Sequence, residues 1–248
     1  MTTSKSIIRA VTIFSTQGPR QASENHLFVE EEKGIVVVAD GFGGPLPGLQ
    51  ASKAACEAVR GFLIKEAGDQ DATLPFELRS YFSLTGNVLF NSLIHANKKL
   101  VALNKGKNVH EKGGASVLAG YLDEGLLALA NVGCCTAWLI RENGAVELTQ
   151  PRSYGRLHDP FAREVPVDKR APLMALGIHK DLEPEISEYR VLDGDWLLLH
   201  TEGMPAEVRG NIFRVRQDLG AKEGARRVLE QLEKGVYDTD LSASLIIL

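Results

Sequence analysis

The sequence predicts one α+β domain in which two antiparallel β-sheets pack together and helices cover their outer faces. Three observations support this fold class. Short runs rich in β-branched residues, typical of strands, come before and after two long helical patterns. Glycine, proline and Asn-Gly turn signals separate these runs. No repeat, low-complexity segment or linker interrupts residues 1–248, so we expect a single domain.

The first half of the chain predicts strands followed by helices. A polar turn joins the second and third strands, which we therefore expect to form a hairpin. The predicted elements are strands at 7–14, 27–29 and 35–39, a loop at 45–48, and helices at 49–66 and about 75–103, connected by 68–74.

The second half predicts mainly short strands. An antiparallel meander is expected over 115–149, and a hairpin is expected around Asp193-Gly194-Asp195. Between them, Gln150–Pro172 is irregular and could cover a site as a flap. The remaining elements are one or two short helices within 205–217, a helix at 221–234 and a last strand at 244–248.

Composition excludes several classes of protein. The formal net charge of −4 argues against a nucleic-acid-binding surface, and no apolar run is long enough to cross a membrane. The first residues lack the apolar core of a signal peptide. The odd set Cys56, Cys134 and Cys135 has no metal-ligand spacing, which favours free thiols in a reducing compartment, and so a cytoplasmic protein.

The most informative stretch is Gly34–Gly44, where an apolar run ends in Asp40 and then Gly41. A strand that delivers a carboxylate to a glycine-rich turn lets the backbone approach a ligand closely. An ordinary turn has the same residue types, so this stretch alone leaves both interpretations open. The predicted hairpin would bring Glu24 to the same end of the sheet.

Further acids follow other predicted strands. They are Glu202 and either Asp238 or Asp240. Converging carboxylates repel one another unless a cation is shared, and Mg²⁺ or Mn²⁺ suits oxygen ligands. Arg20 precedes Glu24 by four positions, and its guanidinium would suit a phosphate. Taken singly, each acid is better explained as a solvated turn residue and Arg20 as a member of a surface ion pair.

Seven segments, in this order, resemble motifs of the metal-dependent PP2C (PPM) family of serine/threonine protein phosphatases. Arg20–Asn25 resembles R-x-x-N-E-D, Val37–Gly44 resembles V-x-A-D-G-x-G-G, and Gly114–Ser116 stands where the family has G-T-T or G-S-T. Leu129–Trp138 resembles A-N-V-G-D-S-R-A-Y, and Ala175–Gly177 resembles the last three residues of R-A-L-G. Gly194–Gly203 resembles G-D-x-L-L-L-C-S-D-G, and Asp238–Leu248 resembles the ending D-N-x-T/S-x-x-x-x. The resemblance implies the family's αββα sandwich.

The resemblance also implies roles for single residues. Asp40 would bridge two Mn²⁺ or Mg²⁺ ions, and Gly41 would bind an ion through its carbonyl oxygen. Glu202 and Asp240 would be further ligands, and Glu24 would act through a bound water. Arg20 would bind the phosphate.

Four positions depart from the motifs. Asn25 and Cys134 stand where the motifs have acids, and the acid at the position of Cys134 is associated with an additional metal in bacterial members of the family. Glu202 stands where the motif has an aspartate. The last ligand falls on Asp238, Thr239 or Asp240, depending on how the final motif is aligned.

Two functions remain open. The first is metal-dependent hydrolysis of phosphoserine or phosphothreonine in proteins, weakened by the replaced ligands, in which an activated water attacks phosphorus directly. The second is a pseudophosphatase that binds a phosphorylated protein, partner kinase or regulator without catalysis. We interpret Cys134-Cys135 as buried apolar side chains and His200 as a histidine of the core or its border.

Overall fold

The computed structural model describes residues 8–66, 78–161, 165–166, 169–215 and 217–248. Its strands are β1 (Ala10–Thr16), β2 (Asn25–Glu30), β3 (Ile35–Phe42), β4 (Gly114–Asp123), β5 (Leu126–Val132), β6 (Thr136–Arg141), β7 (Gly144–Glu147), β8 (Glu185–Arg190), β9 (Trp196–His200) and β10 (Leu241–Ile247). Its α-helices are α1 (Pro45–Glu66), α2 (Leu84–Leu103), α3 (Tyr154–His158), α4 (Ala206–Phe213) and α5 (Ala221–Glu233). Short 3-10 turns lie at Glu31–Lys33, Val109–Glu111 and Gln217–Leu219.

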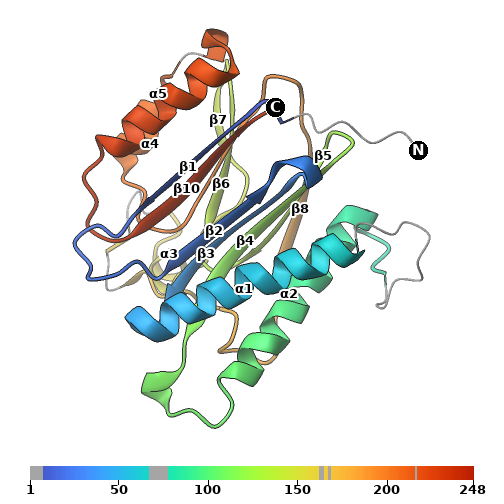
Figure 1. The fold of residues 1–248 in the computed structure, drawn as a ribbon, viewed down its shortest axis with the longest axis vertical. Helices are drawn as coiled ribbons and strands as arrows, with labels where there is room; N and C mark the ends of the chain where they lie inside the picture. The colour runs from blue at the N-terminus through green and yellow to red at the C-terminus, as the bar shows by residue number, and fades with distance from the viewer. Residues whose placement is uncertain (1–7, 67–77, 162–164, 167–168, 216) are drawn as a thin grey trace.

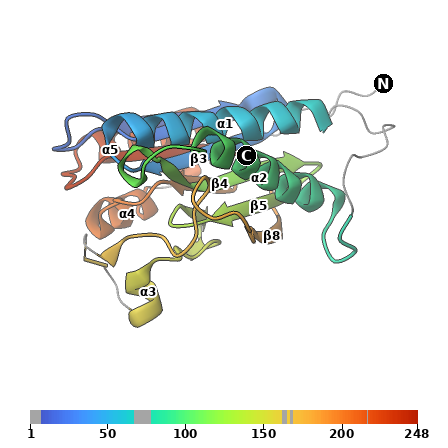
Figure 2. The ribbon, with the colours of Figure 1, turned by 90° about the horizontal axis from the view of Figure 1, so that it is seen from below.

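Two five-stranded antiparallel sheets form the centre of the molecule, with strand orders β1-β10-β9-β6-β7 and β2-β3-β4-β5-β8. Helices α4 and α5 cover the outer face of the first sheet, and α1 and α2 cover the outer face of the second (Figure 1). Figure 2 shows the same layers from below, with α3 set apart from them. The predicted α+β sandwich of two sheets flanked by helices is confirmed.

The valine run before Asp40 is buried on both of its faces. Val37 and Ala39 belong to the apolar cluster under α1 and α2, whereas Val36 and Val38 belong to the cluster between the sheets. Strand side chains alternate, so Asp40 follows Val36 and Val38 on the inner face. Because both faces of β3 are buried, the strand needs apolar residues at successive positions. The same alternation makes the Asp40 side chain point toward the first sheet at the rim of the sandwich.

Several predicted elements are wrong in detail. Residues 115–149 do not form one meander, because β4 and β5 pair in one sheet while β6 and β7 pair in the other. The chain changes sheets after β5 at Gly133, whose φ of 99° is accessible to glycine. The expected hairpin around Asp193–Asp195 is also absent, since β8 pairs with β5 whereas β9 pairs with β10 and β6.

Two helix starts differ from the prediction. The expected loop at 45–48 is the first turn of α1, where Pro45 is tolerated because the first helical N–H groups have no partner within the helix. Helix α2 begins at Leu84 and not near residue 75, because Ser83 caps it by accepting a hydrogen bond from the Gly86 amide. The predicted start at 75, the connector 68–74 and residue 7 of the first strand lie outside the described residues.

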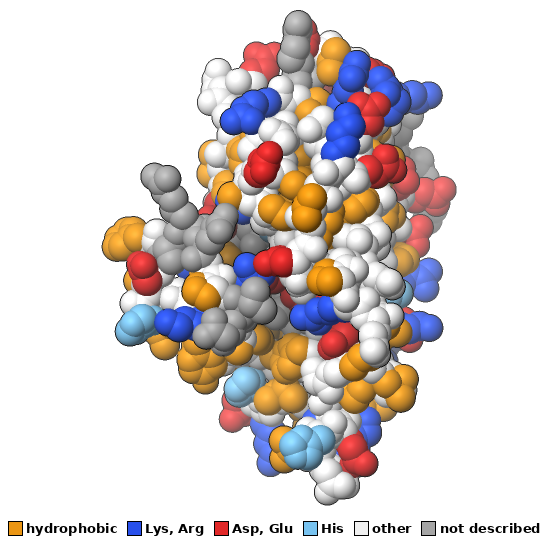
Figure 3. All heavy atoms as spheres, turned by 90° about the vertical axis from the view of Figure 1, so that its left-hand side faces the viewer, with side chains coloured by type: hydrophobic (Ala, Val, Ile, Leu, Met, Phe, Trp, Pro, Cys, Tyr) orange, Lys and Arg blue, Asp and Glu red, His pale blue; other side chains and the backbone are white. Residues whose placement is uncertain are grey.

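In the described part of the chain, no helix combines the length and apolarity needed to cross a bilayer. All three cysteines are buried free thiols. Basic and acidic side chains are interspersed over the face seen in Figure 3, which is hollowed near its middle.

Candidate functional site

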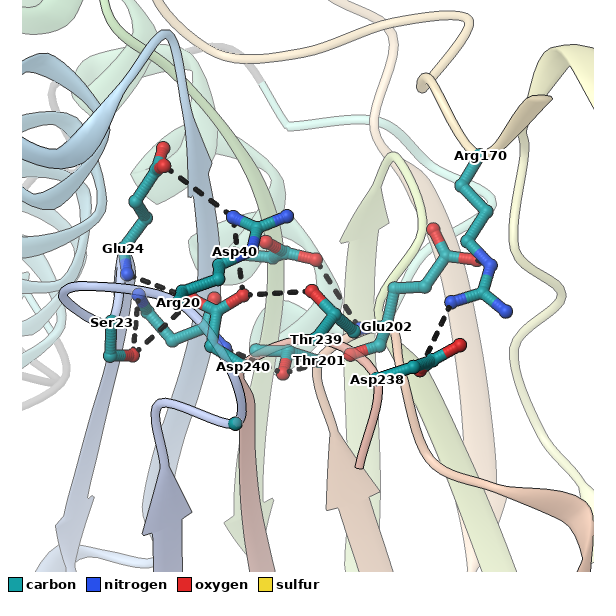
Figure 4. Close-up of polar contacts among 12 residues, drawn as sticks. Arg20, Ser23, Glu24, Asp40, Arg170, Thr201, Glu202, Asp238, Thr239 and Asp240 are labelled. Atoms are coloured by element: carbon teal, nitrogen blue, oxygen red, sulfur yellow. Dashed lines mark hydrogen bonds and ion pairs between the residues drawn. The ribbon is translucent and has the colours of Figure 1, made fainter. Parts of the chain in front are cut away.

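A cavity of about 190 Å³ lies at the rim where the two sheets meet. Five of the six predicted site residues line it, namely Arg20, Asp40, Gly41, Glu202 and Asp240. The sixth, Glu24, lies beside it and contacts Arg20 and Asp240 (Figure 4). The structure therefore brings together residues that come from β3 and from the loops beside β1, β9 and β10.

Asp40 is held by strand pairing on both sides, opposite Asn25 of β2 and Ser116 of β4. The Glu202 amide donates a hydrogen bond to Asp40 Oδ2 at 3.3 Å. Burial raises the pKa of Asp40 to about 8, and the nearby carboxylates of Asp240 and Glu202 act in the same direction. The Glu202 amide and Arg20 oppose this shift only in part. Asp40 is therefore a carboxylate that lacks a full counter-charge.

Gly41 lets three backbone segments meet beside Asp40. Its amide donates to the Glu24 carbonyl at 3.2 Å. A Cβ at this position would lie 2.2 Å from the Gly48 carbonyl oxygen and 2.4 Å from that of Glu24. Backbone atoms cannot yield as side chains do, so any larger residue would push β3 away from the start of α1.

Arg20, Glu24 and Asp240 form a second group of contacts. Arg20 Nη1 lies 3.4 Å from Glu24 Oε1 and 3.3 Å from Asp240 Oδ1. Asp240 Oδ2 accepts hydrogen bonds from the Glu24 amide at 2.8 Å and from Ser23 Oγ at 3.3 Å. Thr239 Oγ1 donates to Asp240 Oδ1 at 3.1 Å. Protein donors thus occupy both oxygens of Asp240, whose side chain is 3% exposed.

Glu202 turns away from Asp40 toward a basic side chain that the sequence did not single out. Arg170 Nε lies 3.6 Å from Glu202 Oε1, and Arg170 Nη1 lies 3.9 Å from Asp238 Oδ1 (Figure 4). Burial raises the pKa of Glu202 to about 7, while Arg170 and Arg156 act against the shift. The only sequence signal for Arg170 is its place in Gln150–Pro172, the segment predicted to cover a site.

The residues that depart from the family motifs are integrated in other ways. Asn25 is buried and donates to Thr201 Oγ1 at 3.1 Å. Cys134 donates to the carbonyls of Arg152 and Arg170 at 3.6 and 3.5 Å, and burial raises its thiol pKa further, so the sulfur is neutral. The buried Cys135 is likewise neutral, since burial raises its pKa.

The three candidate residues near the last strand have different surroundings. Asp238 is exposed and faces Arg170, Thr239 lines the cavity, and Asp240 is buried against Arg20 and Glu24. Asp240 therefore braces the loop that carries Arg20.

A divalent cation suits one half of this site better than the other. Asp40 lacks counter-charge, and Glu24 Oε2 is buried without a hydrogen-bond partner in the described residues. Such oxygens are hard donors, appropriate to Mn²⁺ or Mg²⁺. However, no group of three Asp, Glu, His or Cys side chains within the described ranges is arranged to hold an ion. Glu202 and Asp240 are paired with protein groups, so Asp40 and Glu24 carry the oxygens of this cluster that suit an ion best.

Comparison with known proteins supports the fold. No family model matches the chain, and no curated protein is detectably similar to it in sequence. Among solved structures, the Mycobacterium tuberculosis serine/threonine phosphatase PstP/Ppp superposes with a TM-score of 0.74 at 18% identity, covering 96% of this chain and 98% of that one. Staphylococcus aureus Stp1 gives 0.74 at 17% identity, with coverage of 98% and 96%.

Two further structures extend this comparison. Pseudomonas aeruginosa PppA, described as a key regulatory component of T6SS, gives a TM-score of 0.72 at 19% identity and covers 96% of each chain. The catalytic domain of PstP has also been solved in complex with two manganese ions, and it gives 0.73 at 18% identity with coverage of 96% and 98%. The chain therefore has the fold of PP2C-type (PPM) serine/threonine phosphatases over nearly its full length, as the sequence resemblance predicts.

Proposed function

We propose that this chain is a PP2C-like domain that hydrolyses phosphoserine or phosphothreonine in proteins slowly, with one Mn²⁺ or Mg²⁺ ion at Asp40. One observation carries this proposal. Asp40 sits within a strand that is paired on both sides, short of counter-charge, in a cavity that it shares with Arg20. The fold shared with solved phosphatases supports it.

The residues have separate roles in this proposal. Asp40 would hold the ion, with Gly41 and Glu24 beside it, and the ion would offset negative charge on the phosphoryl group. Arg20 contacts the acids through Nη1, and its side chain is 42% exposed. The rest of its guanidinium fork is therefore positioned to orient a phosphate by charge-assisted hydrogen bonds.

The same geometry supports slow turnover. A fast binuclear phosphatase needs charge and ligands on both sides of the phosphoryl group. Here Arg170 forms an ion pair with Glu202, protein groups donate hydrogen bonds to the Asp240 carboxylate, and the Cys134 thiol is neutral. The contacts of Glu202 and Asp240 leave fewer carboxylate oxygens for an ion, and the neutral thiol of Cys134 adds no negative charge.

The alternative is a pseudophosphatase that binds a phosphorylated protein without hydrolysing it. The pairing of Arg170 with Glu202 favours it, because a guanidinium there supplies positive charge without a metal. Either function implies a phosphorylated protein, its kinase or a regulator as the partner. The buried free thiols support a reducing compartment and thus a cytoplasmic location.

Hydrolysis of an aryl phosphate, measured with and without Mn²⁺, tests the proposal. We expect slow, Mn²⁺-dependent hydrolysis that falls by roughly a hundredfold in Asp40→Ala, because charge and positioning are lost together. Asp123→Ala, at the opposite end of β4, is the matched control and should retain the rate.

Two outcomes would change the conclusion. Hydrolysis that survives Asp40→Ala would show that it does not come from this site. Absence of hydrolysis, combined with phosphopeptide binding that Arg20→Gln weakens, would establish the pseudophosphatase function.

A further inference from the structure

An apolar side chain adjoins the charged residues of the candidate site. Phe42 lines the same cavity as Arg20 and Asp40, and its side chain is partly exposed. Asp40 and Phe42 are two positions apart on β3, so their side chains lie on the same side of the strand, about 7 Å apart along it. The candidate hydrolytic function uses charged groups and the Gly41 carbonyl, and it gives Phe42 no part.

Ile178 extends this apolar surface beyond the lining of the cavity. A Cβ at Gly114, the partner of Phe42 in β4, would lie 2.5 Å from Phe42 Cζ and 2.7 Å from Ile178 Cγ1. Both side chains therefore lie over a glycine, whose missing side chain lets them come together. Ile178 is 44% exposed. We call Phe42 and Ile178 together the apolar pair.

Two buried asparagines of α2 hold the turn that carries Ile178. The Gly177 amide donates to Asn97 Oδ1 at 2.9 Å, and Asn97 Nδ2 donates to the His179 carbonyl at 2.8 Å. Asn104 Nδ2 donates to the Gly177 carbonyl at 3.0 Å. These hydrogen bonds fix the backbone on both sides of Ile178, so its exposed side chain is presented at a set position. Contact with a side chain on a fixed backbone costs less ordering entropy than contact with a mobile one.

The spacing along β3 favours a peptide as the molecule that covers the apolar pair. A phosphate held beside Asp40 lies about two strand positions from Phe42, and an extended peptide advances by about 3.5 Å per residue. A side chain one or two positions from a phosphorylated residue therefore reaches the apolar pair, whereas free phosphate has no group that does. An apolar side chain placed there removes apolar surface of both partners from water, and the gain grows with the area covered.

We propose that the apolar pair binds a large apolar side chain of the protein substrate, one or two positions from the phosphorylated residue. The phosphate would lie at Arg20 and Asp40, and the neighbouring leucine, isoleucine, methionine or phenylalanine would cover Phe42 and Ile178. This inference rests on the proposed function in placing the phosphorylated residue in the candidate cavity. It adds a preference that Arg20 and Asp40 do not supply, because they recognise charge and not the neighbouring side chain.

Fluorescence anisotropy with four labelled peptides tests the proposal. The peptides carry phosphoserine or serine, with leucine or alanine at the two positions on each side. We expect leucine to tighten binding by at least about fivefold, with or without phosphate, because more apolar surface is buried. Ile178→Ser should reduce this preference to less than about twofold, whereas Ile178→Leu should retain it. Hydrolysis of an aryl phosphate should be the same in both variants, because Ile178 lies outside the lining of the cavity.

A matched control removes an exposed apolar side chain elsewhere. Leu192 is 59% exposed and precedes β9, at the end of that strand away from Glu202. Leu192→Ser should leave the leucine preference unchanged. Equal binding of both kinds of flank, a preference that survives Ile178→Ser, or an equal loss in Leu192→Ser would overturn the role of the apolar pair.

The peptide set separates this inference from the proposed function. If serine and phosphoserine peptides bind alike while the leucine preference persists, phosphate recognition fails and the role of the apolar pair stands. If phosphoserine tightens binding and the flanks have no effect, only the role of the apolar pair fails. A dimer in sedimentation velocity that Ile178→Ser dissociates would assign this surface to a second copy of the chain and overturn the proposal.

Discussion

The two halves of the candidate site are built differently. Asp40 lies within a strand whose backbone is paired on both sides, opposite Asn25 and Ser116. Glu202 lies in the turn after β9, and its long side chain reaches an arginine from the segment around α3. A paired strand fixes where a carboxylate points, whereas a long side chain in a turn takes its direction from the nearest opposite charge. We call the part around Asp40 the strand half and the part around Glu202 the turn half. In the strand half the Asp40 carboxylate lacks a full counter-charge, whereas in the turn half the Glu202 carboxylate is paired with Arg170.

The largest effect is expected from disturbing the strand half. Gly41→Ala would place a Cβ against two backbone carbonyls, so we expect a loss of about 2–3 kcal/mol in the free energy of unfolding. Urea denaturation measures this loss. Gly61→Ala in α1 is the control, because its Cβ meets nothing within 4 Å and a helical alanine should stabilise the protein slightly. Equal effects at both positions would show that the strand half is not tightly packed.

Shortening Glu202 to aspartate tests whether its pairing with Arg170 limits the rate of hydrolysis. Glu202→Asp cannot extend to Arg170 as glutamate does, so its oxygens would stay nearer Asp40. We expect Mn²⁺-dependent hydrolysis of an aryl phosphate to rise roughly tenfold. Glu185→Asp shortens an acid paired with Arg152 outside the site and should leave the rate unchanged. A lower rate in Glu202→Asp would mean that glutamate already serves the reaction better.

The missing counter-charge at Asp40 predicts a pH dependence of stability. The folded pKa of about 8 lies above the unfolded value, so the contribution of Asp40 to the free energy of unfolding is most favourable below about pH 4 and is lost as the pH rises toward 8. Asp40→Asn should reduce this fall to the part that Glu202 contributes and, after allowance for partial exposure, stabilise the metal-free protein by about 1 kcal/mol at pH 8. Thermal unfolding at several pH values in the presence of a chelator measures this. A wild-type curve as flat as that of Asp40→Asn would contradict the assigned charge imbalance.

The smallest effect is expected from releasing Glu202. Arg170→Gln removes the guanidinium while keeping a polar side chain, and we expect Mn²⁺ to bind roughly threefold more tightly, as for a partly exposed ion pair. Isothermal titration calorimetry measures this affinity directly. Arg152→Gln breaks the exposed pair with Glu185 and is the matched control. Weaker Mn²⁺ binding in Arg170→Gln would indicate that Arg170 supports the acidic cluster.

The contrast between the halves also explains what the sequence could predict. The valine run and its hairpin with the preceding strand follow from residue preference and pairing, which are local rules. The turn expected at Gly41 was wrong, because β3 continues through Asp40 and Gly41 to Phe42 as it pairs with β4. The sheet to which each later strand belongs depends on long-range contacts, so the expected hairpin around Asp193–Asp195 was wrong. Arg141 forms a two-pronged contact with Asp195 at 2.6 and 2.7 Å, a tertiary constraint that no turn signal records.

In the candidate site, too, features set by local rules could be predicted from the sequence and features set by long-range contacts could not. Convergence of the strand-end acids was predictable because antiparallel strands repeatedly return to the same rim. The pairing of Glu202 with Arg170 and the saturation of Asp240 depend on side chains from segments with no regular pattern. The register near the last strand was open in the sequence, and the structure places Asp240 against Arg20, Thr239 along the cavity and Asp238 at the surface.

Strand β1 pairs with β10, and the Glu24 amide binds Asp240, which lies 216 positions later in the chain. During synthesis, Asp40 and its neighbouring strands leave the ribosome long before β10 exists. A nascent chain can therefore assemble the β2–β3 rim but cannot yet brace Arg20. The contact between Arg20 and Asp240 must therefore form late, when this long loop closes, so the arginine half of the rim depends on the last strand of the chain.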